Sequence, residues 1–477
     1  MTGSTRGIQA YGAFIPRLRI ARAAIAEAHS WALPGLKAQA KGERALCSWD
    51  EDAITLAVAA ARDCLQGQTA PTALILASTT APFADCQNSV IAASALGLAA
   101  STACADQAGS TRAGLTALAQ ALESSAEGAQ LVLAADRRSA KPGSVQELQF
   151  GAGAAALRVG EGAGVARYLG RESVSNLFVD HFRESGEKYD YYWEERWIRD
   201  EGVSRLVPGA IKRLLSRLDL TPAQVKWFGL SGAPAGSDKL VAKLASITPE
   251  AILPNLLDRV GECGTAHAPL LLVSALEQAR PGDVIVVAAF GQGCEVLAFE
   301  KGEDTVAPPR GLTGALAARI PETSYLKMAS FEGELNLDWG MRAETEIKAA
   351  LTQQYRAADQ INAFVGGKCR ACNTVQFPRL PHCVSCAAAD SQDPCSLADE
   401  QAQVATYSAD WLQYYPAPPL YVGLVQFDIG ARLLMEMIEV GSAGIDVGTR
   451  LAMHFRVKAR DRKRHYSRYF WKAAPVY

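Results

Sequence analysis

Two cysteine pairs near the C-terminus constrain the fold more than any other feature of the sequence. Cys369 and Cys372 form one C-x2-C pair, and ten residues separate it from a second pair, Cys383 and Cys386. Four thiolates in two chelating pairs match tetrahedral zinc, with Zn–S distances of about 2.3 Å. Because four cysteines leave no open coordination position, the spacing predicts a structural zinc ribbon over residues 364–390. A ribbon isolated without metal is the alternative that the spacing leaves open.

Residues 7 to 302 alternate short β-rich runs with alanine-rich segments of helical period. Strands are expected over 72–78, 129–136, 154–160, 225–232, 283–291 and 295–302, and helices over 50–65, 109–125, 207–218 and 268–279. This alternation is typical of a layered α/β domain. The order of elements occurs once in residues 1–165 and again in 166–302, which indicates an internal duplication, although the residues themselves barely repeat.

The composition of the chain changes after residue 302. Residues 303–324 have the proline, glycine and polar content of a linker. Residues 325–363 are expected to be a helical connector that leads into the zinc ribbon. From 391 to 477 short alternating runs are separated by turns, which predicts a small all-β barrel.

Charge and cysteine content limit the partners and the location. Charged residues make up 21% of the 477 residues and the formal net charge is -2, so we expect no nucleic acid or membrane partner, but a small molecule or another protein. No apolar stretch approaches the roughly 18 residues of a membrane span, and the start of the chain lacks the apolar core of a signal peptide. Eleven cysteines, four of them in one cluster, fit a reducing compartment better than a disulfide scaffold. We therefore expect a soluble, cytoplasmic protein.

Cys104 is the candidate nucleophile. It lies in the run AASTACADQAGSTRAGLTAL, where a small-residue strand is expected to turn into a helix near Gly109. A thiol beside a helix N-terminus has its thiolate favoured by the helix dipole, so its pKa is expected to fall below about 8.5. Such a thiol can accept an acyl group. A buried, unreactive cysteine is the alternative.

The first 302 residues resemble the HMG-CoA synthase and ketoacyl synthase III branch of the thiolase superfamily. The resembling stretches are GIQAYGAFIPRLRI (7–20), DEDAITLAVAAA (50–61), Cys104 with its alanine-rich helix, GAGAAALRVGEG (151–162), YDYYWEERWIRDEG (189–202), RVGECGTAHAPLLL (259–272) and FGQG (290–293). The resemblance implies a five-layer αβαβα fold, a homodimer, a pantetheine tunnel and an acyl-cysteine intermediate on Cys104. Residues 325–477 resemble the zinc-ribbon plus OB-fold partner domain of such enzymes, through which a higher assembly could form.

A condensing enzyme of this type needs an oxyanion hole as well as a nucleophile. The expected donors are the backbone amides of Cys104 and of the FGQG turn, Gly291, Gln292 and Gly293. Glycine at such a turn lets the backbone approach a bound carbonyl group closely.

The sequence departs from the family at its proton carriers. Gly232 stands where family members usually have a histidine, and Thr79 stands where HMG-CoA synthases have a glutamate base. Glu262 stands where the ketoacyl synthase III type has an asparagine, and His267 follows five residues later. We therefore expect His267 first and Glu262 second to carry the proton. A satisfied histidine at a helix start and a helix-entry or surface carboxylate are the alternatives.

The segment 189–202 combines aromatic with charged side chains. Tyr191, Tyr192 and Trp193 are expected to form a substrate-binding wall or lid, which would suit a bulky or aromatic acyl group. A dimer contact and an amphipathic helix with a wet face are the alternatives.

The expected function is acyl-CoA-dependent acyl transfer through Cys104 that makes or breaks a carbon-carbon bond. This would be a Claisen condensation, or its reverse on a β-keto acid or β-ketoacyl-CoA. The reverse reaction is favoured because attack of Cys104 on the β-carbonyl releases the enolate without a strong base. HMG-CoA synthase-type condensation and a non-catalytic acyl-CoA-binding subunit that scaffolds a partner are the alternatives.

Overall fold

The computed structural model describes residues 6–304, 310–339, 350–461 and 463–476. These residues form two compact units. The first comprises the chain up to Cys47, Asp52–Val90 and Ala100–Met328, and the second comprises Ser48–Glu51, Ile91–Ala99 and the chain from Ala329 onward. Two short segments from the N-terminal hundred residues therefore belong to the C-terminal unit.

A nine-stranded sheet frames the first unit, in the order β11-β12-β13-β8-β1-β7-β6-β4-β5. Its strands are β1 (Arg6–Phe14), β4 (Ala73–Ala77), β5 (Ala103–Gln107), β6 (Gln130–Arg137), β7 (Ala152–Glu161), β8 (Ala166–Ser175), β11 (Val225–Ser231), β12 (Val284–Phe290) and β13 (Gly293–Lys301). The six strands expected from the sequence coincide with six of these to within two residues at each end.

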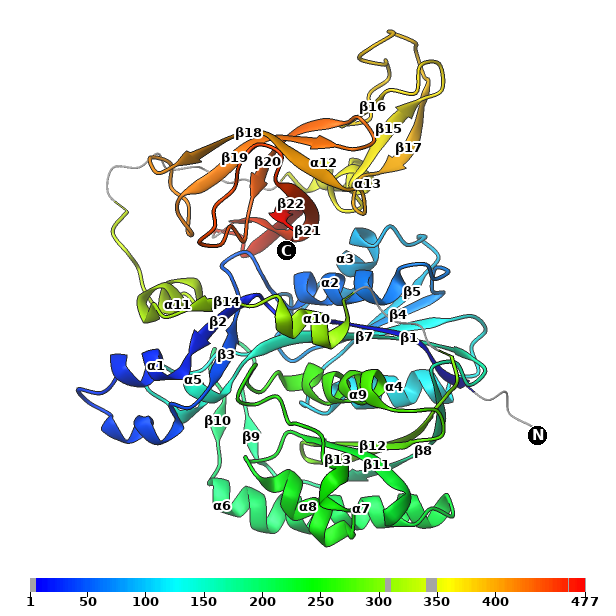
Figure 1. Cartoon of the computed structure of the whole chain (residues 1–477), viewed down its shortest axis with the longest axis vertical. Coiled ribbons are helices and arrows are strands. Elements are labelled where there is room, and N and C mark those ends of the chain that lie inside the picture. The colour runs from blue at the N-terminus through cyan, green and yellow to red at the C-terminus, as the bar shows by residue number, and fades with distance from the viewer. Residues whose placement is uncertain (1–5, 305–309, 340–349, 462, 477) are drawn as a thin grey trace. The chain divides into compact units, whose positions relative to one another are not determined.

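The long helices of the first unit cover and separate the two halves of this sheet. They are α2 (Ala53–Leu65), α4 (Ala113–Glu123), α7 (Ser204–Arg217), α8 (Ser237–Ala245) and α9 (His267–Gln278). Figure 1 shows α4 and α9 between the part of the sheet that holds β1 and β7 and the part that holds β12 and β13, with α7 and α8 outside the latter. The expected five-layer αβαβα arrangement is confirmed, and its two halves join where β1 pairs antiparallel with β8.

Two apolar clusters hold these layers together. One gathers α4 and α9 against the strands, with Leu118 and Leu270 at full burial. The other packs α7 and α8 against β11 to β13, with Leu214 and Phe228 at full burial. The many alanines of α4 and α9 let these central helices pack closely on both faces.

The first unit also contains short elements. They are β2 (Leu18–Ala21), α1 (Arg22–Ala28), η1 (Pro34–Gln39), β3 (Glu43–Leu46), α5 (Val145–Gln149), β9 (His181–Phe182), β10 (Tyr191–Tyr192), α6 (Glu195–Trp197), a π-helical turn η2 (Ile198–Val203), η3 (Pro222–Gln224), η4 (Pro249–Ala251), η5 (Gly264–Ala266), α10 (Gly311–Ala317) and β14 (Ile320–Glu322). Helices α3 (Asn88–Ala95) and α11 (Tyr325–Phe331) are divided between the units.

The expected linker over 303–324 differs from the structure. Its described part contains α10 and β14, and β14 pairs in parallel with β2. Leu312, Ala315 and Leu316 of α10 belong to the larger apolar cluster, so burial of these side chains holds the segment on the first unit. Residues 305–309 of this segment lie outside the described residues.

The second unit contains the predicted ribbon and barrel. Its elements are α12 (Leu351–Arg356), α13 (Ala358–Ile361), the ribbon strands β15 (Val365–Cys369), β16 (Val375–Gln376) and β17 (Gln392–Ser396), and the barrel strands β18 (Ala402–Asp410), β19 (Leu420–Phe427), β20 (Arg432–Met437), β21 (Arg450–Asp461) and β22 (Tyr466–Pro475). The barrel is closed in the order β18-β19-β20-β22-β21, as an OB-like fold requires. The helical connector expected over 325–363 contains α12 and α13, and its residues 340–349 lie outside the described residues.

Buried charges link the segment Ser48–Glu51 to the barrel strands within the second unit. Lys472 Nζ lies 2.9 Å from the carboxylate of Asp50, and the Arg456 guanidinium lies 3.0 Å from that of Glu51. All four side chains are at most 2% exposed. Because a buried charge is tolerated only when it is paired, these carboxylates belong to the interior of the barrel unit.

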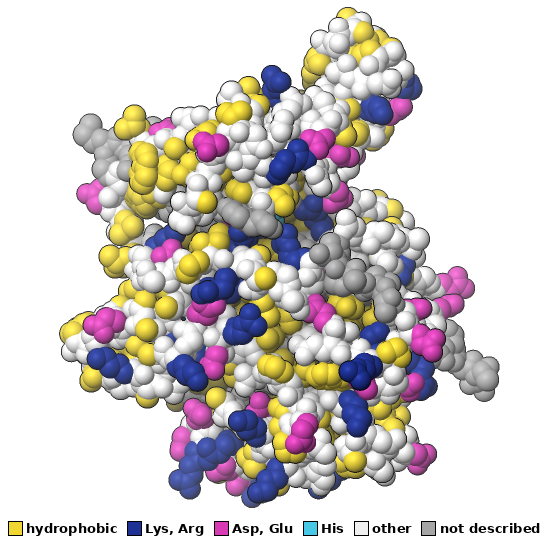
Figure 2. Space-filling view, in the orientation of Figure 1, with side chains coloured by type: hydrophobic (Ala, Val, Ile, Leu, Met, Phe, Trp, Pro, Cys, Tyr) yellow, Lys and Arg dark blue, Asp and Glu magenta, His cyan; other side chains and the backbone are white. Residues whose placement is uncertain are grey.

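The surface carries both signs of charge. Figure 2 shows lysine and arginine side chains interspersed with aspartate and glutamate on the visible face, in keeping with the near-zero net charge. Within the described ranges, no helix has the length and apolar character needed to cross a membrane.

Candidate active site

The turn between β12 and β13 lies directly against the residues that precede α4. Ser110 Oγ donates to the carbonyl oxygen of Gly291 at 3.2 Å, and Thr111 Oγ1 donates to that of Phe290 at 3.3 Å. A Cβ atom on Gly291 would come within 2.6 Å of Ser110 Oγ and 3.0 Å of Thr111 Oγ1. A side chain at 291 would therefore require the Ser110 or Thr111 hydroxyl to shift.

Two backbone N–H groups at this junction are available to a ligand. Within the turn, Gly291 N–H is already used, since it donates to the carbonyl of Gly293 at 3.0 Å. The N–H groups of Gln292 and Thr111 have no hydrogen-bond partner among the described residues. Because α4 begins at Ala113, its N-terminal partial positive charge lies beside them. This pair is suited to hold a negatively charged oxygen.

The structure places Cys104 away from this junction. It is the second residue of β5, which is the edge strand of the sheet, and it pairs with Leu74. The strand continues to Gln107, about 10 Å further along at a rise of roughly 3.3 Å per residue. The carbonyl of Gln107 accepts a hydrogen bond from Ser78 N–H at the carboxyl end of the strands. The expectation that Cys104 lies at a helix start is therefore wrong.

The expected lowering of the pKa of the Cys104 thiol is wrong as well. Burial, and next the carboxylate of Asp106, raise the pKa of the Cys104 thiol above its ordinary value. The start of α4 does not offset these effects, because α4 begins nine residues later. The backbone amide of Cys104 is part of β5, so it is separated from the amides of the 291–293 turn.

A second cysteine follows the turn but does not serve the junction. Cys294 is buried in the apolar cluster of α7 and β11 to β13, with Sγ 3.9 Å from the carbonyl of Leu206. Burial raises its pKa to about 12. The side chains that stand at the junction with Gly291 are instead the hydroxyls of Ser110 and Thr111.

Glu262 forms an ion pair with a buried arginine, Arg138. The Arg138 guanidinium donates to the carboxylates of both Glu262 and Asp190, the latter at 2.6 Å, and lies 3.6 Å above the ring of Phe150. Burial alone would raise the pKa of Glu262, but the guanidinium outweighs it and the pKa falls below its ordinary value. Glu262 is thus held as a carboxylate in an ion pair near neutral pH, which makes it a poor proton carrier.

His267 is a satisfied core histidine. Its Nδ1 accepts the N–H of Cys263 at 3.2 Å, and its Nε2 donates to the carbonyl of Asn255 at 2.9 Å. Burial lowers its pKa, which keeps the ring neutral. With both ring nitrogens engaged, His267 fixes the start of α9 and does not offer a free base.

The aromatic residues of segment 189–202 divide between the surface and the interior. Tyr191 and Trp193 are 58% and 52% exposed. Tyr192 turns inward on β10, stacks on His181 at 5.1 Å and packs 5.9 Å from Phe150. Burial raises the pKa of Tyr192 to about 12, so it remains protonated. Of the three expected wall residues, Tyr192 alone lies against the Arg138 ion-pair network.

The four ribbon cysteines fit a zinc ion. Their Sγ atoms all lie within 4.8 Å of one another, with Cys369 to Cys386 at 3.8 Å and Cys372 to Cys383 at 3.6 Å. Tetrahedral ligands at the usual Zn–S length stand about 3.8 Å apart. Zinc bound there would link the Cys369–Cys372 pair to the Cys383–Cys386 pair.

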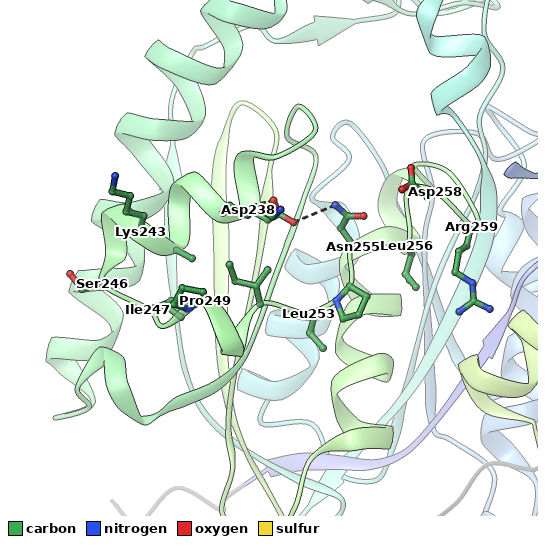
Figure 3. Close-up of a pocket in the computed structure, with 14 residues that line it drawn as sticks. Asp238, Lys243, Ser246, Ile247, Pro249, Leu253, Asn255, Leu256, Asp258 and Arg259 are labelled. Atoms are coloured by element: carbon green, nitrogen blue, oxygen red, sulfur yellow. Dashed lines mark hydrogen bonds between the residues drawn. The ribbon is translucent and has the colours of Figure 1, made fainter. Parts of the chain in front are cut away.

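A pocket of about 910 Å³ lies between α8 and the segment 252–259 (Figure 3). Apolar side chains such as Ile247 and Leu253 line it, together with the cations Lys239, Lys243 and Arg259. Asn255 Nδ2 donates to Asp238 at 3.3 Å and so connects its two sides. The pocket therefore combines apolar walls with charges of both signs, since Asp238 and Asp258 line it beside the three cations.

Comparisons with known proteins agree with these features. The family model for the C-terminal part of 3-oxoacyl-[acyl-carrier-protein] synthase III matches residues 215–299, and that for the ChsH2 rubredoxin-like zinc ribbon matches 356–391. The hydroxymethylglutaryl-CoA synthase of Aeropyrum pernix is 30% identical over 299 residues, which cover 61% of this chain and 82% of that protein. The chain belongs to the hydroxymethylglutaryl-CoA synthase family.

Further relatives and solved structures agree with this assignment. The family member from Pyrococcus horikoshii is 29% identical over 303 residues, or 61% of this chain and 85% of that protein. An HMG-CoA synthase solved with CoA covers 72% of this chain and 94% of its own, with a TM-score of 0.59 and 17% identity. The synthase III of Pseudomonas aeruginosa covers 64% of this chain and 100% of its own, with a TM-score of 0.57 and 18% identity. The protein is thus a thiolase-superfamily enzyme of the Claisen-condensing type.

This member of the hydroxymethylglutaryl-CoA synthase family has altered positions around the junction. Gly232 has a φ of +72°, and a Cβ atom there would meet the carbonyl oxygen of Phe290 at 2.2 Å, so the position has no room for a histidine side chain. Thr79 Oγ1 donates to the buried carboxylate of Asp136 at 3.0 Å. Thr111, and not Cys104, lies next to the start of α4. The glutamate and histidine expected of the family are thus absent from these described positions.

Proposed function

We propose that this protein binds a coenzyme A thioester and makes or breaks a carbon-carbon bond beside its carbonyl group. The observation that carries the proposal is the pair of unpartnered N–H groups of Thr111 and Gln292 at the Gly291 junction. Two such donors stabilise the charge that develops on a thioester oxygen when an enolate or a tetrahedral intermediate forms. Membership of a family of thioester-condensing enzymes supports the same chemistry.

The pocket beside α8 is the proposed place for coenzyme A. Its apolar walls suit the pantetheine arm, and Lys239, Lys243 and Arg259 suit the phosphate groups. Asn255 in its wall accepts the hydrogen bond from His267, which stands at the start of α9 next to the Glu262 segment. A bulky or aromatic acyl group is proposed to pack near Tyr192 and Phe150.

Acyl transfer is proposed to be direct, within a ternary complex. In the condensing direction the enolate carbon attacks the carbonyl of a second CoA thioester, and the CoA thiolate leaves. In reverse, the CoA thiolate attacks the β-carbonyl and the enolate leaves. Thr111 is a weak nucleophile without an adjacent base, and its hydroxyl already donates to Phe290. Cys104 on β5 is not required for either direction.

Intact-protein mass spectrometry combined with product analysis tests this function. The full-length protein is incubated with acetyl-CoA, benzoyl-CoA and β-ketoacyl-CoA thioesters, and free CoA and carbon-carbon products are followed. We expect turnover with sequential kinetics, no acyl adduct on the wild type, and an adduct on Thr111→Cys. A wild-type adduct that disappears in Cys104→Ser would refute direct transfer and restore the acyl-Cys104 pathway.

A second candidate function is a thioester-binding subunit that supports a partner enzyme without turnover. The observation that favours it is the engagement of Thr79 with Asp136 and of Glu262 with Arg138, which removes both from proton transfer. Saturable acyl-CoA binding without any product or CoA release would support this candidate over the first. The homodimer stays a prediction, which light scattering of the full-length protein checks.

A further inference from the structure

Asp180 and His181 form a close pair that includes none of the residues expected to be catalytic. His181 Nδ1 lies 2.6 Å from Asp180 Oδ2. The Asp180 side chain is 3% exposed and that of His181 is 15% exposed. The second carboxylate oxygen of Asp180 is buried without a hydrogen-bond partner among the described residues. The carboxylate is therefore committed to the imidazole.

The segment that carries this pair runs from the candidate oxyanion hole to the family's glutamate position. At one end, Asn176 N–H donates to the carbonyl of Gln292 at 3.2 Å. At the other end, the Arg183 guanidinium donates to the carbonyl of Thr79. His181 lies between these two anchors. His181 follows the first anchor by five residues and precedes the second by two.

The ring of His181 is oriented on a second side as well. It stacks on Tyr192 with an interplanar angle of 16°. Around this stack lie the ion pairs of Arg138 with Glu262 and Asp190, and Arg183, whose Nε is 3.6 Å from Asp190. His181 Nε2 has no hydrogen-bond partner among the described residues. A carboxylate on Nδ1 fixes the tautomer in which Nε2 carries the free lone pair.

We propose that His181 is the proton carrier of the thioester chemistry and that Asp180 is its positioning residue. This inference rests on the proposed function. In the forward step, Nε2 takes a proton from the α-carbon of the thioester. The C–H bond breaks, and its electron pair moves to the enolate oxygen held by the N–H groups of Thr111 and Gln292. In the reverse step, the Nε2 proton returns to the enolate carbon.

The experiment measures deuterium incorporation into the methyl group of acetyl-CoA in D2O, catalysed by the full-length protein. We expect the wild type to accelerate exchange and His181→Gln to lose at least about 100-fold, the lower end of general acid-base contributions. Free imidazole is expected to restore exchange to His181→Ala. Asp180→Asn is expected to lower the exchange rate without changing acetyl-CoA affinity, and Asp180→Glu to recover part of it.

The matched control is His29→Gln. His29 also pairs with a buried carboxylate, since its Nε2 lies 2.9 Å from Glu147, and it is expected to leave exchange unchanged. Exchange that persists in His181→Gln, or a wild type that binds acetyl-CoA without accelerating exchange, would overturn the assignment of His181. A wild type that neither binds acetyl-CoA nor acts on β-ketoacyl-CoA thioesters would instead refute the proposed function itself.

Discussion

Replacing Arg138 by methionine removes the cation that two buried carboxylates share. The guanidinium is 3% exposed and pairs with Glu262 and Asp190, which are only 14% and 13% exposed. Breaking a buried ion pair by removing one partner costs about 3–5 kcal/mol, because the other charge is left uncompensated. We expect Arg138→Met to lower the free energy of unfolding of the first unit by that amount at pH 7. Methionine keeps most of the apolar volume, so the loss reports charge.

The stability of wild type and of Arg138→Met is expected to change with pH in opposite directions. In the wild type the pKa of Glu262 lies below its ordinary value, so its contribution to stability is present above about pH 4.5 and is lost at lower pH. Without Arg138, burial raises that pKa, so stability recovers as the pH falls. Hydrogen exchange measured on peptides from β6 and α9 follows the first unit alone. The double variant with Glu262→Gln is expected to recover part of the loss. A change below about 0.5 kcal/mol in Arg138→Met, the range of ordinary surface substitutions, would refute the reasoning.

Three further predictions follow from single contacts. Cys383→Ser is expected to reduce bound zinc from one per chain to almost none in elemental analysis, whereas Cys395→Ser keeps it; equal zinc in both variants would contradict the ribbon site. Gly291→Ala places a Cβ atom 2.6 Å from Ser110 Oγ, which must shift, and is expected to lower thioester turnover. The control Gly35→Ala, where nothing lies within 4 Å, is expected to leave turnover unchanged, and normal turnover in Gly291→Ala would count against the junction. The lowered pKa of His267 means that the protein loses stability as the pH falls below about 6.5, and His267→Gln is expected to flatten the melting temperature between pH 7 and pH 5; an unchanged slope would show that another group titrates.

The strands and long helices could be predicted because burial imposes regular patterns on them. The run at 283–291 is apolar throughout because β12 is buried on both faces, and it was correctly expected as a strand. Strand β5 carries a weaker signal, because only its small residues indicate a strand. Its residues, Ala103–Gln107, are small or polar because it lies at the sheet edge, and so the start of α4 was expected too early. The helix start expected near Gly109 lies four residues before Ala113, where α4 begins.

The candidate site was harder to predict, because tertiary contacts decide which groups are free. Glu262 and His267 have the right chemistry in the sequence, but Arg138 and Asn255 engage them from distant positions in the chain. His181 gave only a weak signal, an aspartate immediately before a histidine.

The carboxylates of Asp50 and Glu51 have a consequence for how the C-terminal unit can be inherited or engineered. A fragment that begins at Ala329 would retain Lys472 and Arg456 inside its barrel without these two counter-charges. Glu436 and Glu439 would remain as partial partners, at 3.0 and 2.6 Å. The barrel therefore depends on residues from the N-terminal part of the chain for the pairing of its buried cations. Exchange with a homologous barrel would require the tetrapeptide Ser48–Glu51 to be transplanted with it, so the two ends of the gene are constrained to change together.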